Sequence, residues 1–275
     1  MPETPSPEQI RAAVDARRDE FVQMVLRAVG ISSVTGNEGP VQAVVRSMME
    51  NHGLEVDEFL SSPEEIADYV THVGEQETFE NRPSLVGTRK GAGGGKSLLF
   101  NGHVDTVPVE DRAKWTRSPE GEIVGDRIYG LGSTDMKSGT LTGIFVAQVL
   151  EDLGITLKGD LMVNAVTGEE DGGLGTMSTI LHGYRPDGVV IPEPTHLDIA
   201  IASGGSLVYR ITVTGKAAHG ANRNAGVSAI EKFIPIFQDL LAWEAERQET
   251  VHHPLYYHCE SSCPIITGSV RSVYW

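Results

Sequence analysis

Short apolar segments alternate with longer segments of helical periodicity between residues 8 and 203, and this alternation restricts the fold more than any other feature of the chain. Apolar residues recur at helical spacing in four segments, at 8–29, 37–51, 141–153 and 175–181. The short runs between and after them predict strands at 54–60, 84–88, 97–101, 160–166, 189–191 and 198–202. Helices that alternate with short buried strands favour a three-layer α/β domain with a mixed, mainly parallel sheet.

The pattern changes after residue 203. Residues 206–214 alternate apolar and polar side chains, which is typical of a strand with one buried face, and residues 226–247 have helical spacing. Two more strand-like segments lie at 265–267 and 269–274. We therefore expect one domain over residues 8–203 and a smaller α+β domain over residues 204–275.

The charge balance excludes two classes of partner. Asp and Glu outnumber Lys and Arg by 38 to 22, which gives a formal net charge of −16, and the basic residues form no cluster. Nucleic acids and anionic membranes are bound by basic surfaces, so we expect neither as a partner.

The cysteine content and the hydropathy pattern indicate the compartment. The two cysteines, Cys259 and Cys263, are too few for a secreted disulfide scaffold. No apolar run reaches the roughly 18 residues of a membrane-spanning helix, and the N-terminus lacks the basic and apolar regions of a signal peptide. These features predict a cytoplasmic protein.

Polar residues follow two of the predicted strands directly. His103 and Asp105 come after the strand at 97–101, where an imidazole could bind a metal ion and the nearby carboxylate could fix its tautomer. A loop histidine beside a solvated aspartate explains the pair equally well. Glu169 and Glu170 follow the strand at 160–166, and two adjacent carboxylates are costly there unless a cation lies between them. Taken alone, this pair would more often be a solvated loop.

Two further carboxylates occupy similar positions. Asp135 precedes the predicted helix at 141–153 in a glycine-rich turn, and taken alone it is better explained as a helix N-cap. Glu193 follows the strand at 189–191, between two prolines, where a turn residue is the simpler explanation. Ligands bind at the carboxyl ends of strands in open α/β sheets, so together these residues favour a metal site. A histidine with several carboxylates suits zinc or cobalt, and manganese is also compatible.

Five short motifs occur in order along the chain: NGHVDTVP at 101–108, GLGSTDMKSG at 130–139, TGEED at 167–171, PEPT at 192–195 and VTGKAAHG at 213–220. With these motifs the sequence resembles the M20 metallopeptidase family, the dizinc group that includes acetylornithine deacetylase and succinyl-diaminopimelate desuccinylase. The resemblance runs from about residue 10 to the end of the chain.

The resemblance implies a site for two Zn²⁺ ions, with Co²⁺ or Mn²⁺ as alternatives. His103 and Glu193 would bind the first ion, Asp135 would bridge both ions, and Glu170 would bind the second. The family often has a cis peptide after the bridging aspartate, which here is the bond between Asp135 and Met136.

The resemblance also implies three catalytic roles. Asp105 would orient His103, and Glu169 would be the general base toward the bridging water. His219, in the small domain, would polarise the scissile carbonyl group.

In this family the small domain is a ferredoxin-like lid and dimerisation domain inserted into the catalytic domain, which resumes after it and supplies a further histidine for the second metal. Residues 204–275 would be part of that lid, so the chain is expected to be C-terminally truncated. His252, His253 and His258 fall in the lid region, and we assign none of them to the metal.

Two functions follow from the resemblance. The first is a metal-dependent amidohydrolase that cleaves the amide bond of N-acyl amino acids or related small, peptide-like amides through a metal-bridged water, in a protein that forms a homodimer through the lid. The alternative is a truncated, catalytically impaired homologue that acts as a metal-binding or dimerising module. The retained Glu169 favours the first function, and the absence of the further histidine favours the second.

Overall fold

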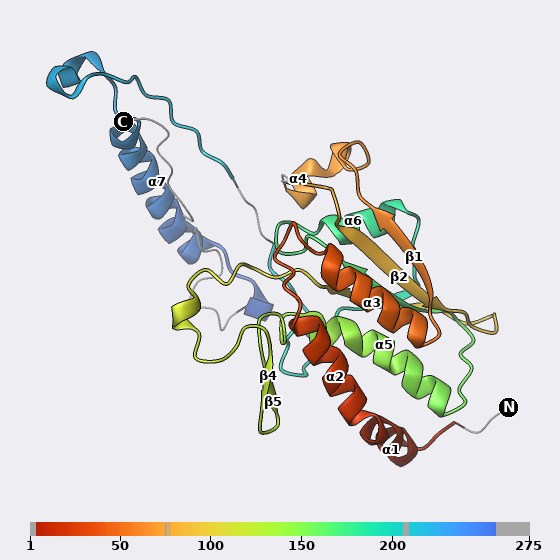
Figure 1. The fold of residues 1–275 in the computed structure, drawn as a ribbon. Coiled ribbons are helices and arrows are strands. Elements are labelled where there is room, and N and C mark those ends of the chain that lie inside the picture. Colours follow the sequence, from red (N-terminus) through yellow and green to blue (C-terminus); the bar gives the residue numbers. More distant parts are fainter. Residues whose placement is uncertain (1–3, 75, 77, 206–208, 257–275) are drawn as a thin grey trace. The chain divides into compact units, whose positions relative to one another are not determined.

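A computed structural model describes residues 4–74, 76, 78–205 and 209–256 (Figure 1). The chain divides into two units, Met1–Ile199 and Ala200–Trp275, and each is described by itself. This division falls slightly before the predicted boundary at residues 203 and 204.

The first unit is built on a five-stranded sheet with the strand order β1-β2-β6-β3-β7. Strand β2 is antiparallel to both β1 and β6, whereas β3 is parallel to both β6 and β7. Four strands therefore point the same way, β2 alone is reversed, and the prediction of a mixed, mainly parallel sheet is confirmed. The strands are β1 (Glu55–Leu60), β2 (Pro83–Arg89), β3 (Leu98–His103), β6 (Leu161–Val166) and β7 (Gly188–Val190).

Helices pack against both faces of this sheet. The largest buried cluster joins α2, α3 and α5 to alternate residues of the sheet, among them Leu85, Leu161 and Val163. Their sequence neighbours Val86 and Met162 point to the other face, as the period of a strand requires. The helices are α1 (Pro7–Ala16), α2 (Arg18–Val29), α3 (Gly39–Asn51), α4 (Val70–Val73), α5 (Lys137–Asp152) and α6 (Leu174–Leu181), with 3₁₀ turns at Ala67–Tyr69 and Arg112–Lys114.

Two details of the first unit differ from the sequence prediction. The helix expected over 8–29 is broken at Arg17 into α1 and α2. The guanidinium of Arg17 pairs with Asp152 of α5 at 2.8 Å. No strand forms at 198–202. A short hairpin of β4 (Glu122–Val124) and β5 (Arg127–Tyr129) is present where the sequence pattern predicted no strand.

The second unit contains one long helix, α7 (Ala229–Thr250), capped by Ser228, whose hydroxyl accepts the amide of Glu231 at 3.1 Å. The strand predicted at 206–214 is not formed over its described part, residues 209–214. The strands predicted at 265–267 and 269–274 lie outside the described residues. Short 3₁₀ turns occupy Gly220–Ala225 and Pro254–Tyr256. Among the described residues of both units, no helix combines the length and apolar character needed to cross a membrane.

Helix α5 approaches the sheet closely at Gly102, the residue before His103. A Cβ atom at Gly102 would lie 2.5 Å from the Thr140 hydroxyl and 3.1 Å from the Thr140 Cα. The same hydroxyl donates to the carbonyl oxygen of His103 at 2.8 Å. The helix is therefore fixed to the end of β3 by a contact that only glycine permits.

We predict that Gly102→Ala destabilises the protein by about 1–3 kcal/mol, the usual cost of overpacking a core, because α5 must move away from β3. The matched control is Gly188→Ala in β7, where the new Cβ would meet only Leu98 Cδ1, at an ordinary 3.6 Å. Chemical denaturation measures both variants. Equal stability of the two would contradict the close approach of α5.

Candidate metal centre

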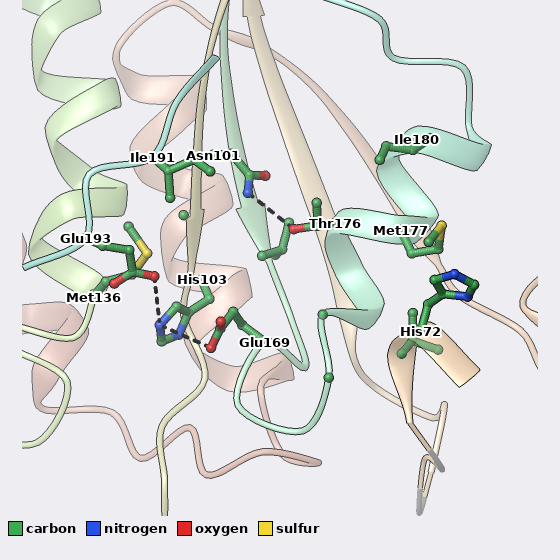
Figure 2. A pocket seen from close by; sticks show the side chains of 15 residues that line it. His72, Asn101, His103, Met136, Glu169, Thr176, Met177, Ile180, Ile191 and Glu193 are labelled. Atoms are coloured by element: carbon green, nitrogen blue, oxygen red, sulfur yellow. Dashed lines mark hydrogen bonds and ion pairs between the residues drawn. The ribbon is translucent and has the colours of Figure 1, made fainter. Parts of the chain in front are cut away.

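The polar residues singled out by their positions after strands gather at one edge of the sheet. The β3–β6 register pairs His103 with Val166, so both strands end together, and β7 runs in the same direction. His103 is the last residue of β3, while Glu169 follows β6 and Glu193 follows β7. Asp135 reaches the same edge from the turn before α5. Figure 2 shows His103 between Glu169 and Glu193.

The imidazole of His103 is the centre of this group. The residue is 1% exposed, and its Nε2 atom lies 2.9 Å from Asp135 Oδ1. Glu193 Oε1 and Glu169 Oε2 lie 3.7 and 3.8 Å from the same nitrogen. Three carboxylates thus face one nitrogen atom of a buried ring.

The other ring nitrogen is held by the backbone. His103 Nδ1 lies 2.9 Å from the carbonyl oxygen of Asp105 and 3.5 Å from the Asp105 carboxylate. A carbonyl oxygen can only accept, so Nδ1 carries a hydrogen, and Nε2 is the ring nitrogen that would offer its lone pair to a metal ion. This tautomer is the one that a metal ligand requires at Nε2.

The Asp105 carboxylate makes its closest contacts elsewhere. Asp105 is fully buried, and its two oxygens accept the backbone amides of Glu169 at 3.2 Å and Glu170 at 3.1 Å. The Thr35 hydroxyl donates to it at 3.0 Å. Asp105 therefore orients the loop at residues 167–173, the glutamate loop, and it also lies beside the imidazole.

The donor set fits a divalent metal ion. One ligand atom each from His103, Asp135 and Glu170 lie within 4.8 Å of one another. An imidazole nitrogen and carboxylate oxygens are the ligands that zinc takes in catalytic sites. The predicted ligands Glu193 and Asp135 both face His103 Nε2, so all four residues expected to bind metal lie together in the first unit.

Burial and mutual repulsion disturb the acidity of these groups. Burial raises the pKa of Glu193 to about 6, and burial also raises the pKa values of Glu169 and Glu170. Burial by itself lowers the pKa of His103, but the Asp105, Glu169 and Glu193 carboxylates together raise it to about 9. The group is therefore short of positive charge, and without a metal ion the imidazole takes up a proton.

A cleft of about 310 Å³ opens beside the group (Figure 2). His103, Glu169 and Glu193 line one side of it. The side chains of Met177, Ile180 and Ile191 give the cleft apolar walls. A small organic molecule could therefore lie next to the candidate ligands.

Several residues that support the site were missed in the sequence. Glu38 and Arg82 form a fully buried ion pair at 2.8 Å. The Lys137 amino group donates to the carbonyl oxygens of Ala28 and Ile31, at 3.0 and 2.9 Å. No local sequence pattern distinguishes Glu38 and Arg82 from solvated charged residues. Lys137 gave one available signal, because it lies within the GLGSTDMKSG motif.

A known protein family matches this chain in sequence. The model of peptidase family M20/M25/M40 matches residues 99–259, more than half of the chain. The chain belongs to this family. The peptide between Asp135 and Met136 is cis, as the resemblance implied.

Two curated enzymes are similar to this chain in sequence. The chain is 29% identical over 263 residues to the N-formyl-4-amino-5-aminomethyl-2-methylpyrimidine deformylase of Halalkalibacterium halodurans, which covers 90% of this chain and 57% of that protein. It is 35% identical over 174 residues to the acetylornithine deacetylase of Pectobacterium carotovorum, covering 61% of this chain and 43% of the relative. The chain thus spans about half the length of the curated relatives it matches.

A solved structure supports the fold. Human carnosine dipeptidase 1 superposes with a TM-score of 0.54 at 21% identity, covering 67% of this chain and 40% of the dipeptidase. This similarity confirms the α/β architecture of the M20 catalytic domain.

His219, the remaining predicted catalytic residue, belongs to the second unit. Its ring nitrogen Nδ1 accepts the amide of Ala221 at 3.2 Å, at the start of a 3₁₀ turn. His252 and His253 lie after α7 in the same unit, and His258 lies outside the described residues. The role of His219 stays a prediction.

We predict that His103→Ala weakens zinc binding by more than about 100-fold, since even residues that only orient metal ligands are worth roughly 10–100-fold in affinity. Zinc affinity is measured by competition with a chromophoric chelator. The control is His182→Ala, because His182 pairs with Glu65 at 3.0 Å and is outside the His103 group. Equal zinc affinity of the two variants would rule out His103 as a ligand.

Zinc affinity should also decrease as the pH is lowered. The pKa of His103 in the metal-free protein is raised to about 9, so below that pH an incoming ion must displace the proton from Nε2. The dissociation constant should rise about tenfold for each unit of pH lowered below about 9, and more steeply below about pH 6, where Glu193 also holds a proton. Calorimetric titration in buffers of different ionisation enthalpy counts the protons released. An affinity that does not change between about pH 6 and 8 would contradict this coupling.

Proposed function

We propose that the protein is a metal-dependent amidohydrolase that cleaves the amide bond of N-acyl amino acids or related small amides. The observation that carries the proposal is the convergence of a buried imidazole and four carboxylates beside a cleft, at the edge of the sheet where α/β enzymes bind ligands. Membership of the M20 family supports it.

In this proposal His103 and Glu193 would hold one Zn²⁺ ion, Glu170 would hold the second, and Asp135 would be a ligand of both. Co²⁺ or Mn²⁺ could take the same donors. A bound metal would supply Lewis acidity for the scissile carbonyl and for the attacking water. Asp105 keeps the glutamate loop and the His103 ring in place.

Glu169 is assigned the proton transfers. Its Oε2 atom lies 3.8 Å from His103 Nε2. Burial raises the pKa of Glu169 toward neutral pH, and a general base works best when its pKa is near the operating pH. Glu169 accepts a proton from the water that attacks the amide carbon. It then passes this proton to the leaving nitrogen as the carbon–nitrogen bond breaks, so that the carboxylate is regenerated.

The cleft suggests which part of the substrate lies in the first unit. Met177, Ile180 and Ile191 offer apolar contacts, while Asn101 and Thr176, joined by a hydrogen bond of 3.2 Å, add polar ones (Figure 2). Short acyl groups carried on an amino acid suit such a mixture. The names of the relatives, a deformylase and a deacetylase, agree with small acyl groups.

The second unit completes the proposal. His219 would polarise the scissile carbonyl, and the unit would serve as lid and dimer contact. Side chains such as Ile230, Ile234 and Trp243 of α7 are about half exposed, which suits a helix that contacts a second copy.

The two cysteines suit a reducing compartment, and we place the protein in the cytoplasm. Sedimentation analysis and cell fractionation test these two points.

We predict that Glu169→Gln lowers kcat for N-acetyl amino acids by about 10²–10⁴-fold while zinc affinity changes by less than about tenfold, because the amide cannot take a proton. The assay is run with zinc or cobalt supplied. Glu151→Gln is the control, since Glu151 is exposed and its nearest cation is Arg89, at 3.8 Å.

Two results would refute parts of this proposal. Near-normal turnover by the Glu169 variant would remove Glu169 as the base. Zinc binding without turnover in the unmodified protein would favour the alternative of a metal-binding or dimerising module.

A further inference from the structure

We propose that the buried Glu38–Arg82 ion pair is a positioning device that sets the backbone of the loop at residues 167–173, and through it the side chains of Glu169 and Glu170. The inference rests on the proposed function for the roles of these two glutamates, but the geometry of the loop is independent of it.

Three successive amides of this loop are bound by two buried carboxylates. Gly168 donates to Glu38 Oε1 at 3.3 Å, and the next two amides, those of Glu169 and Glu170, donate to the two oxygens of Asp105. Glu38 and Asp105 are both fully buried. Glu38 therefore binds the amide that comes directly before the two amides bound by Asp105.

Arg82 fixes Glu38 in turn. Its Nη2 and Nε atoms donate to the two carboxylate oxygens of Glu38 at 2.8 and 2.9 Å, the paired geometry that gives arginine its directional strength. Nη1 donates to the Gln76 side chain and to the Thr78 carbonyl, both at 3.0 Å. The guanidinium is thus tied on several sides and cannot turn without losing buried hydrogen bonds.

The reversed strand places Arg82 under the loop. Because β2 is antiparallel to β6, the start of β2 lies at the edge where β6 ends, and the pairing of Leu85 with Ala165 continues toward Arg82 and Gly168. The Thr167 hydroxyl donates to the Arg82 carbonyl at 3.3 Å. A parallel strand in this place would have carried Arg82 to the opposite edge.

The loop backbone lies directly against the guanidinium. Gly168 has φ +64, and a Cβ atom there would be 2.9 Å from Arg82 Nη2 and 3.0 Å from Asp171 Oδ1. Asp171 Oδ2 lies 3.5 Å from the same Nη2, and Asp171 Oδ1 is buried without a hydrogen-bond partner among the described residues. Arg82 thus supplies positive charge next to a loop with three consecutive acidic residues.

Stability alone is a weak reason for such a pair. Apolar residues of similar volume often replace a buried ion pair without loss of stability, whereas loss of one partner is strongly destabilising. A positioning role can therefore be separated from a stabilising one. A double variant, Glu38→Leu with Arg82→Met, removes both charges and also removes the acceptor for the Gly168 amide.

The first experiment measures hydrogen exchange of the metal-free protein by mass spectrometry. In Glu38→Gln the peptide that spans 167–173 should exchange about tenfold faster or more, while the β6 peptide, 161–166, keeps its protection. The dissociation constant for zinc should rise by roughly 10–100-fold, the usual effect of losing a residue that orients metal ligands. Glu58→Gln, which weakens an exposed pair with Arg46, is the matched control and should change neither quantity.

The second experiment uses the double variant. Its denaturation midpoint should recover toward that of the unmodified protein, while fast exchange at 167–173 and weak zinc binding persist. Recovery of loop protection and zinc affinity together with stability would show that the pair is only structural, and would overturn the proposal. Unchanged loop exchange in Glu38→Gln would overturn it as well.

Arg82→Lys provides a variant that keeps the charge, in case the double variant does not fold. Lysine cannot make the paired contacts, so the loop should again exchange faster than in the unmodified protein, and full protection would contradict the proposal. The exchange readout needs neither metal nor turnover. A protein that fails to hydrolyse N-acyl amino acids yet shows the loop effect would refute the proposed function and leave the positioning role intact.

Discussion

The first unit is organised around the repulsion between carboxylates at one edge of its sheet. Asp135, Glu169 and Glu193 face a single imidazole nitrogen, and the buried carboxylate of Asp105 lies on the other side of the ring. Burial makes this repulsion stronger, because charges interact more strongly away from water. Burial first, and then the neighbouring carboxylates, raise the pKa values of the three glutamates. A divalent ion relieves this repulsion more effectively than a proton on His103.

Hydrogen bonds and an ion pair within the first unit stabilise the carboxylates that do not face the candidate metal position. Asp105 accepts two backbone amides and the Thr35 hydroxyl, and Glu38 is paired with Arg82. The hydrogen bonds of Asp105 and the Glu38–Arg82 pair both depend on the topology of the sheet. Parallel β3 and β6 end at one edge, which brings His103 to the glutamate loop, and the reversed β2 begins at that edge, which brings Arg82 there. One antiparallel strand in a mainly parallel sheet thus brings to this edge the cation that pairs with Glu38.

Much of this arrangement could be predicted from the sequence. Residues directly after short apolar runs must lie at strand ends, and parallel strands end together, so the predicted closeness of His103, Glu170 and Glu193 needed only the periodicity and the motifs. The supporting pair could not be found in this way. Glu38 was part of a predicted helix and Arg82 preceded a strand, and no local pattern distinguishes them from solvated charges. Their contact depends on the reversal of β2, which periodicity does not reveal. The break at Arg17, a residue that pairs with the distant Asp152, was likewise not visible in the helical periodicity of 8–29.

The adjacent residues Glu169 and Glu170 show why the loop backbone matters so much. The two residues lie in a turn, and in the proposed function one binds a metal ion while its neighbour handles protons. That division holds only if the peptide between them keeps its orientation, since a misplacement of about 1 Å at a reacting group can cost about 10²-fold in rate. The carboxylate of Asp105 accepts both amides, but it also lies against His103, so movement of the ring would disturb the loop. A second anchor at Gly168, bound to a carboxylate outside the metal group, makes the loop less dependent on the state of the imidazole.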